Sequence, residues 1–175
     1  MFQIGDAVVH PIHGAGIVTD IAELKRRGHS EPYYRIELLN QPRTSVMISV
    51  GSAEERGMRE AIAASRLERV WRVLNSSPRP LPTDHTVRHE LLRDKLRGGD
   101  VHRVAEVLRD LVWRRRLKGH LTTVERSLYR KGVSLLAGEI AASRDIDLVD
   151  AKLRVWKRIR KSLTQHQGRS WGWLK

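Results

Sequence analysis

Three prolines within five residues divide this sequence into two unlike parts. Pro78, Pro80 and Pro82 each lack a backbone N–H donor and push the preceding residue toward extended geometry. No helix can therefore run through residues 78–82, a segment that we name the proline strap. Most of the sequence before the strap has the short alternating runs of strands, whereas the sequence after it has helical periodicity. We expect an α+β chain of two domains.

Residues 1–55 are typical of a small antiparallel β domain. Apolar and polar residues alternate in short runs at 2–9, 16–21, 33–38 and 46–50, and residues that favour turns separate these runs. A charged loop is expected between the second and third runs, at residues 25–32. Several short strands with Gly and Pro at the bends predict a strongly bent, SH3/Tudor-like β-barrel.

Residues 56–160 predict a compact α-helical bundle. From Ala53 to Leu74 apolar residues recur every three or four positions, which predicts one or two helices before the strap. Capping signals then mark three further helix starts and an acidic fourth, and glycines mark two stops. These signals are Thr83 or Asp84 with Gly98–Gly99, Asp100 with Gly119, the capping box of Thr122 and Glu125, and Asp147 with Asp150.

The tryptophans mark packing surfaces. Trp71, Trp113 and Trp156 lie among aliphatic neighbours at helical spacing, so we expect them in the core or between helices, or else at the joint of the two domains. Residues 161–175 form a C-terminal tail. Its Trp171 and Trp173 are expected to fold back at least partly on the bundle, because exposed tryptophan pairs are uncommon without a partner.

The net charge of +13 lies almost entirely in the helical part. Residues 1–60 hold 7 Lys/Arg and 8 Asp/Glu, whereas residues 61–175 hold 26 and 12. This segregation is expected of a protein that meets nucleic acid with one domain and something else with the other. The near-neutral charge of the first domain favours a protein partner there. A general nucleoid or RNA-binding protein, without contact to a polymerase, is the alternative function.

The sequence offers little for catalysis, so we expect no enzyme activity, no cofactor and no metal. It has no cysteine, P-loop or HExxH motif. His10 with His13, and His85 with His89, are spaced as pairs of ligands are, but neither pair has an obvious third ligand. Because no leader and no long apolar run is present, we expect no contact with a membrane. The expected location is the cytoplasm, in association with the nucleoid.

Several segments resemble, in order and spacing, the CarD/CdnL family of bacterial RNA polymerase-binding transcription regulators. The resemblance rests on FQIGDAVVHPIHGAGIV at 2–18, YYRIEL at 33–38, GMREAI at 57–62, the proline strap, the Gly-Asp pair at 99–100 followed by VAEVLRDL at 104–111, and LLAGEIA at 135–141. The first domain is also similar to the polymerase-interaction domain of transcription-repair coupling factor. A monomer is expected.

The resemblance implies that the first domain binds the RNA polymerase β subunit by extending a sheet edge. Two family positions that contact the polymerase fall on Leu24 and Met47. Lys25, Arg26 or Arg27 can substitute for the cation missing at Leu24. Met47 replaces a charge-assisted contact by an apolar one, so edge pairing would carry more of the affinity.

The resemblance also implies that the helical domain sits on promoter DNA just upstream of the melted region, mostly on the backbone and minor groove, and stabilises the open complex. Relatives place a wedging tryptophan where this chain has His85. Arg88 and Arg126 align with basic residues that contact DNA. His89 and Arg93 lie on the same predicted helix as His85 and complete the expected DNA-binding set.

Overall fold

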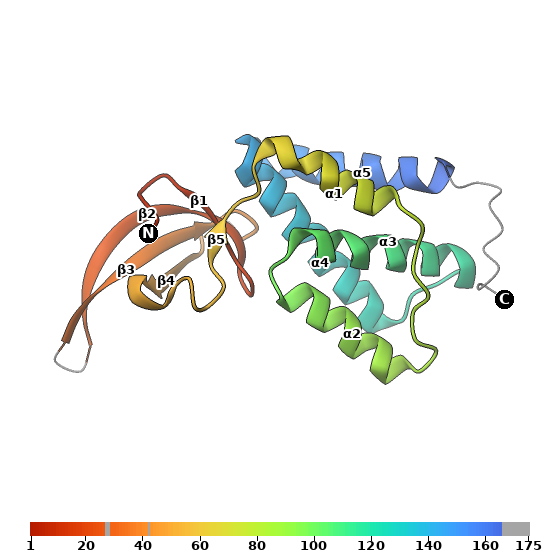
Figure 1. Ribbon diagram of the computed structural model, residues 1–175, viewed down its shortest axis with the longest axis horizontal. Coiled ribbons are helices and arrows are strands. Elements are labelled where there is room, and N and C mark those ends of the chain that lie inside the picture. The colour runs from red at the N-terminus through yellow and green to blue at the C-terminus, as the bar shows by residue number, and fades with distance from the viewer. Residues whose placement is uncertain (27–28, 42, 166–175) are drawn as a thin grey trace.

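The computed structural model describes residues 1–26, 29–41 and 43–165, and it has the two-domain α+β architecture that the sequence predicts (Figure 1). A bent antiparallel sheet is followed by a bundle of helices. The strands are β1 (Ala7–His10), β2 (Gly14–Arg26), β3 (His29–Leu38), β4 (Ser45–Ser49) and β5 (Arg59–Glu60). The helices are α1 (Leu67–Asn75), α2 (His85–Arg97), α3 (Val101–Lys118), α4 (Thr123–Arg144) and α5 (Leu148–Gln165), with short 3-10 helices η1 (Val50–Ser52) and η2 (Ala64–Arg66).

The sheet has the strand order β4-β3-β2-β1-β5, with each described pair antiparallel. Strands β2 and β3 form one long hairpin whose register shifts between Val18 and Asp20. Tyr34, Ile36 and Val18 fill the inner face of the sheet. The expected loop at residues 25–32 is wrong, because β2 continues to Arg26 and β3 begins at His29. Cross-strand pairing here overrides the local charge and the turn tendency of Pro32.

The helix expected from Ala53 begins only at Leu67. Gly57 has a φ of +79°, which is incompatible with a continuing helix, and Arg59 and Glu60 pair with β1 as β5. Met58 is therefore buried in the core of the sheet domain. The apolar residues of this stretch serve both domains, because Ala53 and Met58 pack in the sheet core and Ile62 packs against the bundle core. The exact boundary between the domains, expected at residue 55, stays a prediction.

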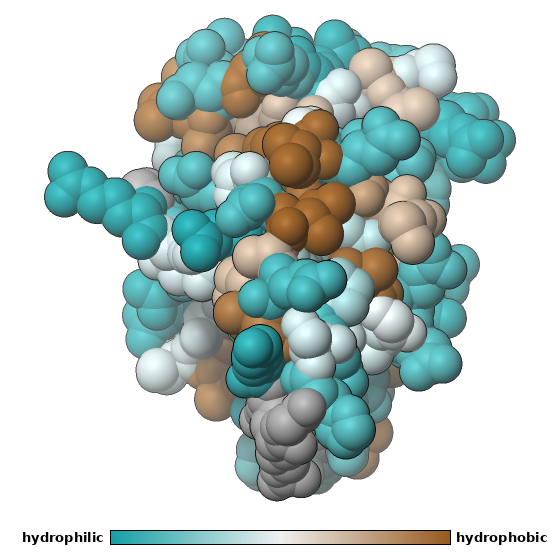
Figure 2. Space-filling view, turned by 90° about the vertical axis from the view of Figure 1, so that its left-hand side faces the viewer, coloured by the Kyte–Doolittle hydropathy of each residue, from teal (hydrophilic) through white to brown (hydrophobic). Residues whose placement is uncertain are grey.

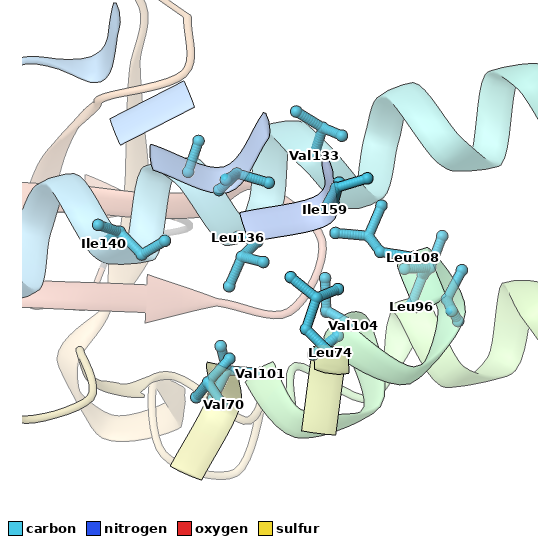
Figure 3. Close-up of a cluster of buried hydrophobic side chains, with 14 of the residues drawn as sticks. Val70, Leu74, Leu96, Val101, Val104, Leu108, Val133, Leu136, Ile140 and Ile159 are labelled. Carbon is cyan, nitrogen blue, oxygen red and sulfur yellow. The ribbon is translucent and has the colours of Figure 1, made fainter. Parts of the chain in front are cut away.

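The bundle buries a continuous apolar core between its helices (Figure 3). Leu74, Leu96, Val104, Leu108 and Leu136 come from four different helices and are at most 4% exposed. The predicted caps are confirmed: the side chains of Asp84, Asp100 and Thr122 each accept a first-turn N–H, and Gly119 has left-handed geometry after α3. Thr122 and Glu125 form the full capping box.

Two expectations about the tryptophans have different outcomes. Trp71 and Trp113 are buried in the bundle, as expected, whereas Trp156 is 49% exposed on α5. Its expected place in the core is wrong, because the buried stripe of α5 passes through its neighbour Val155 and through Ala151 and Ile159. The last helix runs on to Gln165. Trp171 and Trp173 lie outside the described residues.

An arginine links the two domains where the sheet packs on α4, and we call this contact the Arg59–Glu139 joint. The guanidinium of Arg59 on β5 donates to both carboxylate oxygens of Glu139 on α4, at 2.7 and 3.0 Å, and to the carbonyl of Gly99 at 2.6 and 3.2 Å. Glu139 is buried and also accepts the backbone N–H of Ile62. Gly99 has a φ of +68°, and a Cβ there would lie 3.2 Å from the Pro11 ring. The joint therefore brings together three of the segments that carry the family resemblance, namely residues 57–62, 99–100 and 135–141.

Candidate nucleic-acid interface

The N-terminal end of α2 is an exposed tip at the end of the bundle that lies away from the sheet (Figure 1). Asp84 caps the helix by accepting the N–H of Val87 at 2.9 Å. His85 is the first helical residue and its side chain is exposed. An exposed helix start carrying an imidazole can approach a phosphate or an unstacked base. We call the exposed residues 83–87 the α2 tip.

Arg88 holds the α2 tip in place from inside the bundle. Only 3% of the residue is exposed, and its Nε donates to Glu125 at 2.7 Å. Its terminal nitrogen donates to the carbonyls of Pro82, Thr83 and Asp84, at 2.7, 2.8 and 3.3 Å. One side chain thus fixes the end of the proline strap and the start of α2 against α4.

Glu125 is the centre of this buried network. Its Oε1 accepts from both Arg88 and Arg114 at 2.7 Å, and its Oε2 accepts the N–H of Thr122 at 2.9 Å. Burial alone would raise the pKa of the Glu125 carboxyl, but the Thr122 N–H and the two guanidinium groups outweigh it and hold the pKa below its ordinary value. The carboxylate is therefore ionised and paired at neutral pH.

His89 lies beneath the tip, one turn after His85. It is 9% exposed, and its Nε2 lies 3.4 Å from the hydroxyl of Thr122. Burial lowers the pKa of His89, the Glu125 carboxylate opposes this, and the neighbouring Arg88 and Arg93 cations add to it. The imidazole of His89 is therefore neutral at pH 7.

Of the five predicted DNA-binding residues, the structure exposes three and buries two. His85, Arg93 and Arg126 are exposed, whereas Arg88 and His89 are buried. A side chain must be exposed to reach a phosphate, so Arg88 and His89 are placed to position the tip. A local sequence pattern cannot predict this burial, because Arg88 and its partner Glu125 lie 37 residues apart. The DNA-binding role of all five residues stays a prediction.

A second pair of charges fixes the other end of the proline strap. Asp110 of α3 accepts the N–H of Arg79 at 3.0 Å and the Nε of Arg109 at 2.8 Å. Arg109 also donates to the hydroxyl of Ser76 at 2.8 Å. Arg109 itself is buried, with 4% of the residue exposed. The strap is therefore anchored at both ends, so the position of the α2 tip is well defined.

The sheet domain presents a separate surface on its outward face. Met47 on β4 pairs directly with Arg35 on β3, and Arg35 pairs with Asp20 on β2. Leu24 lies four residues along β2 from Asp20 and so shares this face, where it is 40% exposed. The polymerase-binding residues predicted from the sequence do not include Arg35, which is an exposed cation directly beside Met47 on the neighbouring strand. The backbone of Arg26 ends β2, and Lys25 beside it is exposed.

Hydrophobic residues also gather on this end of the molecule. Figure 2 shows them in the middle of the view, with hydrophilic residues around them. Exposed apolar patches with a polar rim mark interaction sites more often than chance. The large hydrophobic residues that the sheet domain exposes are Met1, Ile4, Ile12, Ile21 and Leu24.

The described residues contain neither a cluster of metal ligands nor a membrane-spanning helix. Within residues 1–26, 29–41 and 43–165, no three His, Asp or Glu side chains gather as a metal site would require. His10 accepts the N–H groups of Ile12 and His13 through its Nδ1, which occupies that nitrogen. No helix in the part of the chain that the structure describes combines the length and apolar character needed to cross a bilayer.

The fold defines a two-domain protein in which a bent antiparallel sheet is tied to a basic helical bundle. Residues 2–62 match the family model of the CarD-like/TRCF RID domain, and residues 69–155 match that of the CarD C-terminal domain. The chain is 30% identical over 148 residues to "Putative transcription factor YdeB" of Bacillus subtilis (strain 168), across 83% of this chain and 94% of that protein. The chain belongs to the CarD-like family of transcription regulators.

Proposed function

We propose that this protein regulates transcription by binding RNA polymerase with its sheet domain and promoter DNA with its helical domain. The match of residues 2–62 to the CarD-like/TRCF RID domain supports the polymerase contact, and the β subunit is the proposed partner. The basic charge of residues 61–175 supports the DNA contact. The protein would act as a monomer on the nucleoid, in the cytoplasm.

The Arg59–Glu139 joint is the observation that carries this proposal. It links a near-neutral domain to a basic one through a partly buried, bidentate ion pair, in which Glu139 is buried and the Arg59 side chain is 35% exposed. A protein that only coated DNA would need no fixed second domain. A regulator that bridges polymerase and promoter does need one, because the two contacts must lie at a defined distance. The alternative of a general nucleoid or RNA-binding protein leaves the joint without a role.

On DNA, the exposed part of the α2 tip makes the proposed contact just upstream of the melted region. His85 stacks on a base or donates to a phosphate there, and Arg93 and Arg126 contact the backbone. Arg88 and His89 act from beneath by holding the tip. An imidazole covers less of an exposed base pair than an indole does, so the open complex is stabilised less than with a tryptophan at this position.

On the polymerase, the proposed contact combines the free edge of β4 with the outward face of the sheet. Backbone groups of an edge strand can pair with a strand of the partner. Met47, Leu24 and Arg35 then lie beside the new strand, and Arg35 supplies the charge that Met47 lacks. Arg35→Ala should weaken binding of the β subunit several-fold, whereas Arg66→Ala, an exposed arginine outside the sheet, should leave it unchanged.

The test is the lifetime of promoter open complexes formed by the cognate polymerase. Wild type should lengthen the lifetime, His85→Ala should remove most of that effect, and His85→Trp should increase it. Equal lifetimes with and without each variant, together with tight DNA binding, would support the nucleoid-protein alternative instead. Gel-shift assays on the same promoter without polymerase separate loss of DNA binding from loss of the effect on the complex.

A further inference from the structure

Helix α5 carries a basic surface that the proposed function does not use. Its 18 residues include six Lys/Arg and a single Asp. The helix lies with α1 on one side of the bundle, and α2 lies on the other (Figure 1). A ligand on the outer face of α5 would therefore not touch the α2 tip.

Most of these cations have no partner within the part of the chain that the structure describes. Arg158 pairs with Glu68 at 3.6 Å and stacks over the Trp71 ring. The side chains of the other five form no ion pair or hydrogen bond with described residues. These are Lys152, Arg154, Lys157, Arg160 and Lys161.

An exposed aromatic residue lies among these cations. Trp156 is 49% exposed, and Val149 and Leu153 beside it on α5 are 64% and 42% exposed. Lys152 precedes Trp156 by four residues and Arg160 follows it by four, so the three side chains line one face of the helix. With a rise of about 1.5 Å per residue, each cation lies about 6 Å from the indole along the axis.

We propose that this face of α5 is a second binding site, specific for single-stranded DNA. An unpaired base stacks on Trp156, and the phosphates on either side of it contact Lys152 and Arg160. Aromatic platforms flanked by cations bind single strands with little regard for sequence. Duplex DNA hides the faces of its bases, so it cannot use the indole in this way.

Charge and shape argue against the other occupants of such a face. Three apolar side chains interrupted by two cations make too short a strip to seat a membrane surface or a long partner helix. The five free cations call for a polyanion. The side chains of Lys152, Trp156 and Arg160 contain no hydrogen-bond acceptor, so a 2′-hydroxyl gains no bond as a donor there and RNA has no advantage over DNA. The proposal goes beyond the proposed function and does not depend on polymerase binding.

The test measures binding of a fluorescent 20-nucleotide oligothymidylate to the full-length protein over a range of salt concentrations. Trp156→Leu should weaken binding about 5- to 100-fold, whereas Trp156→Phe, which keeps an aromatic face, should stay within about threefold of wild type. The double variant Lys152→Ala/Arg160→Ala should lower the slope of log affinity against log salt by about 1.4, since each phosphate contact on a single strand contributes about 0.7. Trp156 is half exposed, so these variants keep the core.

The matched control is Arg154→Ala/Lys161→Ala, which removes two cations from another face of α5. Equal weakening by the two double variants would overturn the proposal, because binding would then follow charge alone. Trp156→Leu binding as tightly as wild type, or a matched oligouridylate binding more tightly than the DNA, would also overturn it. His85→Ala should bind the oligonucleotide like wild type, so failure at the α2 tip and failure at α5 can be told apart.

Discussion

Glu125 shows how one residue can serve the fold and the candidate site together. Its backbone N–H and one carboxylate oxygen complete the capping box that begins α4, and its other oxygen holds Arg88 and Arg114. A sequence pattern identifies the first role, because the box spans four residues. It misses the second role, because those partners come from α2 and α3.

Removing the Glu125 carboxylate should destabilise the protein strongly. Glu125→Ala leaves Arg88 buried without its counter-charge, and breaking a buried pair in this way costs about 3–5 kcal/mol. Glu68→Ala is the matched control, since Glu68 also lies in the first turn of a helix but pairs with Arg158 at the surface. It should cost less than about 1 kcal/mol. Urea denaturation measures both, and equal losses would contradict the assigned role of Glu125.

Two buried histidines predict a loss of stability in mild acid. Burial lowers the pKa of both His10 and His89 below the ordinary value of 6.5, so the unfolded chain binds protons more readily than the folded one. The free energy of unfolding should therefore be highest above that value and fall as the pH drops from 7.5 to 5.5. The lowered pKa of Glu125 affects the free energy of unfolding only below about pH 4.5, which is outside this window. His89→Gln should flatten the profile, and an unchanged slope would exclude His89 as a source.

At the scale of elements, the caps of the helices set the geometry of the α2 tip. Asp84→Ala removes the bond to the first turn of α2 and should cost about 0.5–2 kcal/mol. It should also shorten the open-complex lifetime, because His85 is the next residue. Asp147→Ala removes the equivalent bond to Val149 at the start of α5. This control should lose similar stability while leaving the lifetime unchanged.

Elements with local signals were predictable from the sequence, and those with distant partners were not. The strap, the caps of α2 to α4 and the two-domain division follow from residues a few positions apart. The long β2–β3 hairpin, the place of Met58 in the sheet core and the buried Arg109 depend on partners in other elements. The exposure of Trp156 could not be predicted either. Apolar neighbours at helical spacing show that α5 has an apolar face, but they do not show which residues at the edge of that face other helices cover. The exposed half of the candidate site was predicted, and its buried support was not.

At the scale of the molecule, the Arg59–Glu139 joint holds the sheet domain against the helical bundle. Glu139→Ala removes the charged acceptor of both Arg59 and the Ile62 N–H and should cost about 1–3 kcal/mol. The effect on open complexes should fall further than binding to either partner alone, because the spacing between the contacts is no longer fixed. Small-angle scattering should show a larger radius of gyration. A variant that keeps the wild-type radius but loses the effect would contradict this account.

The two ends of helix α2 lie at the two parts of the molecule that the proposed function uses. Its C-terminal end is followed by Gly99, whose carbonyl is bound by the joint, and its N-terminal end carries His85. The helix is 13 residues long, so it spans about 20 Å. Under the proposed function, the length of α2 would therefore set the distance between the sheet domain and the promoter. One extra turn in α2 would move the proposed contact about 5 Å farther along the DNA, roughly one and a half base pairs, so a relative with a longer α2 would be expected to act on a different register of the same promoter.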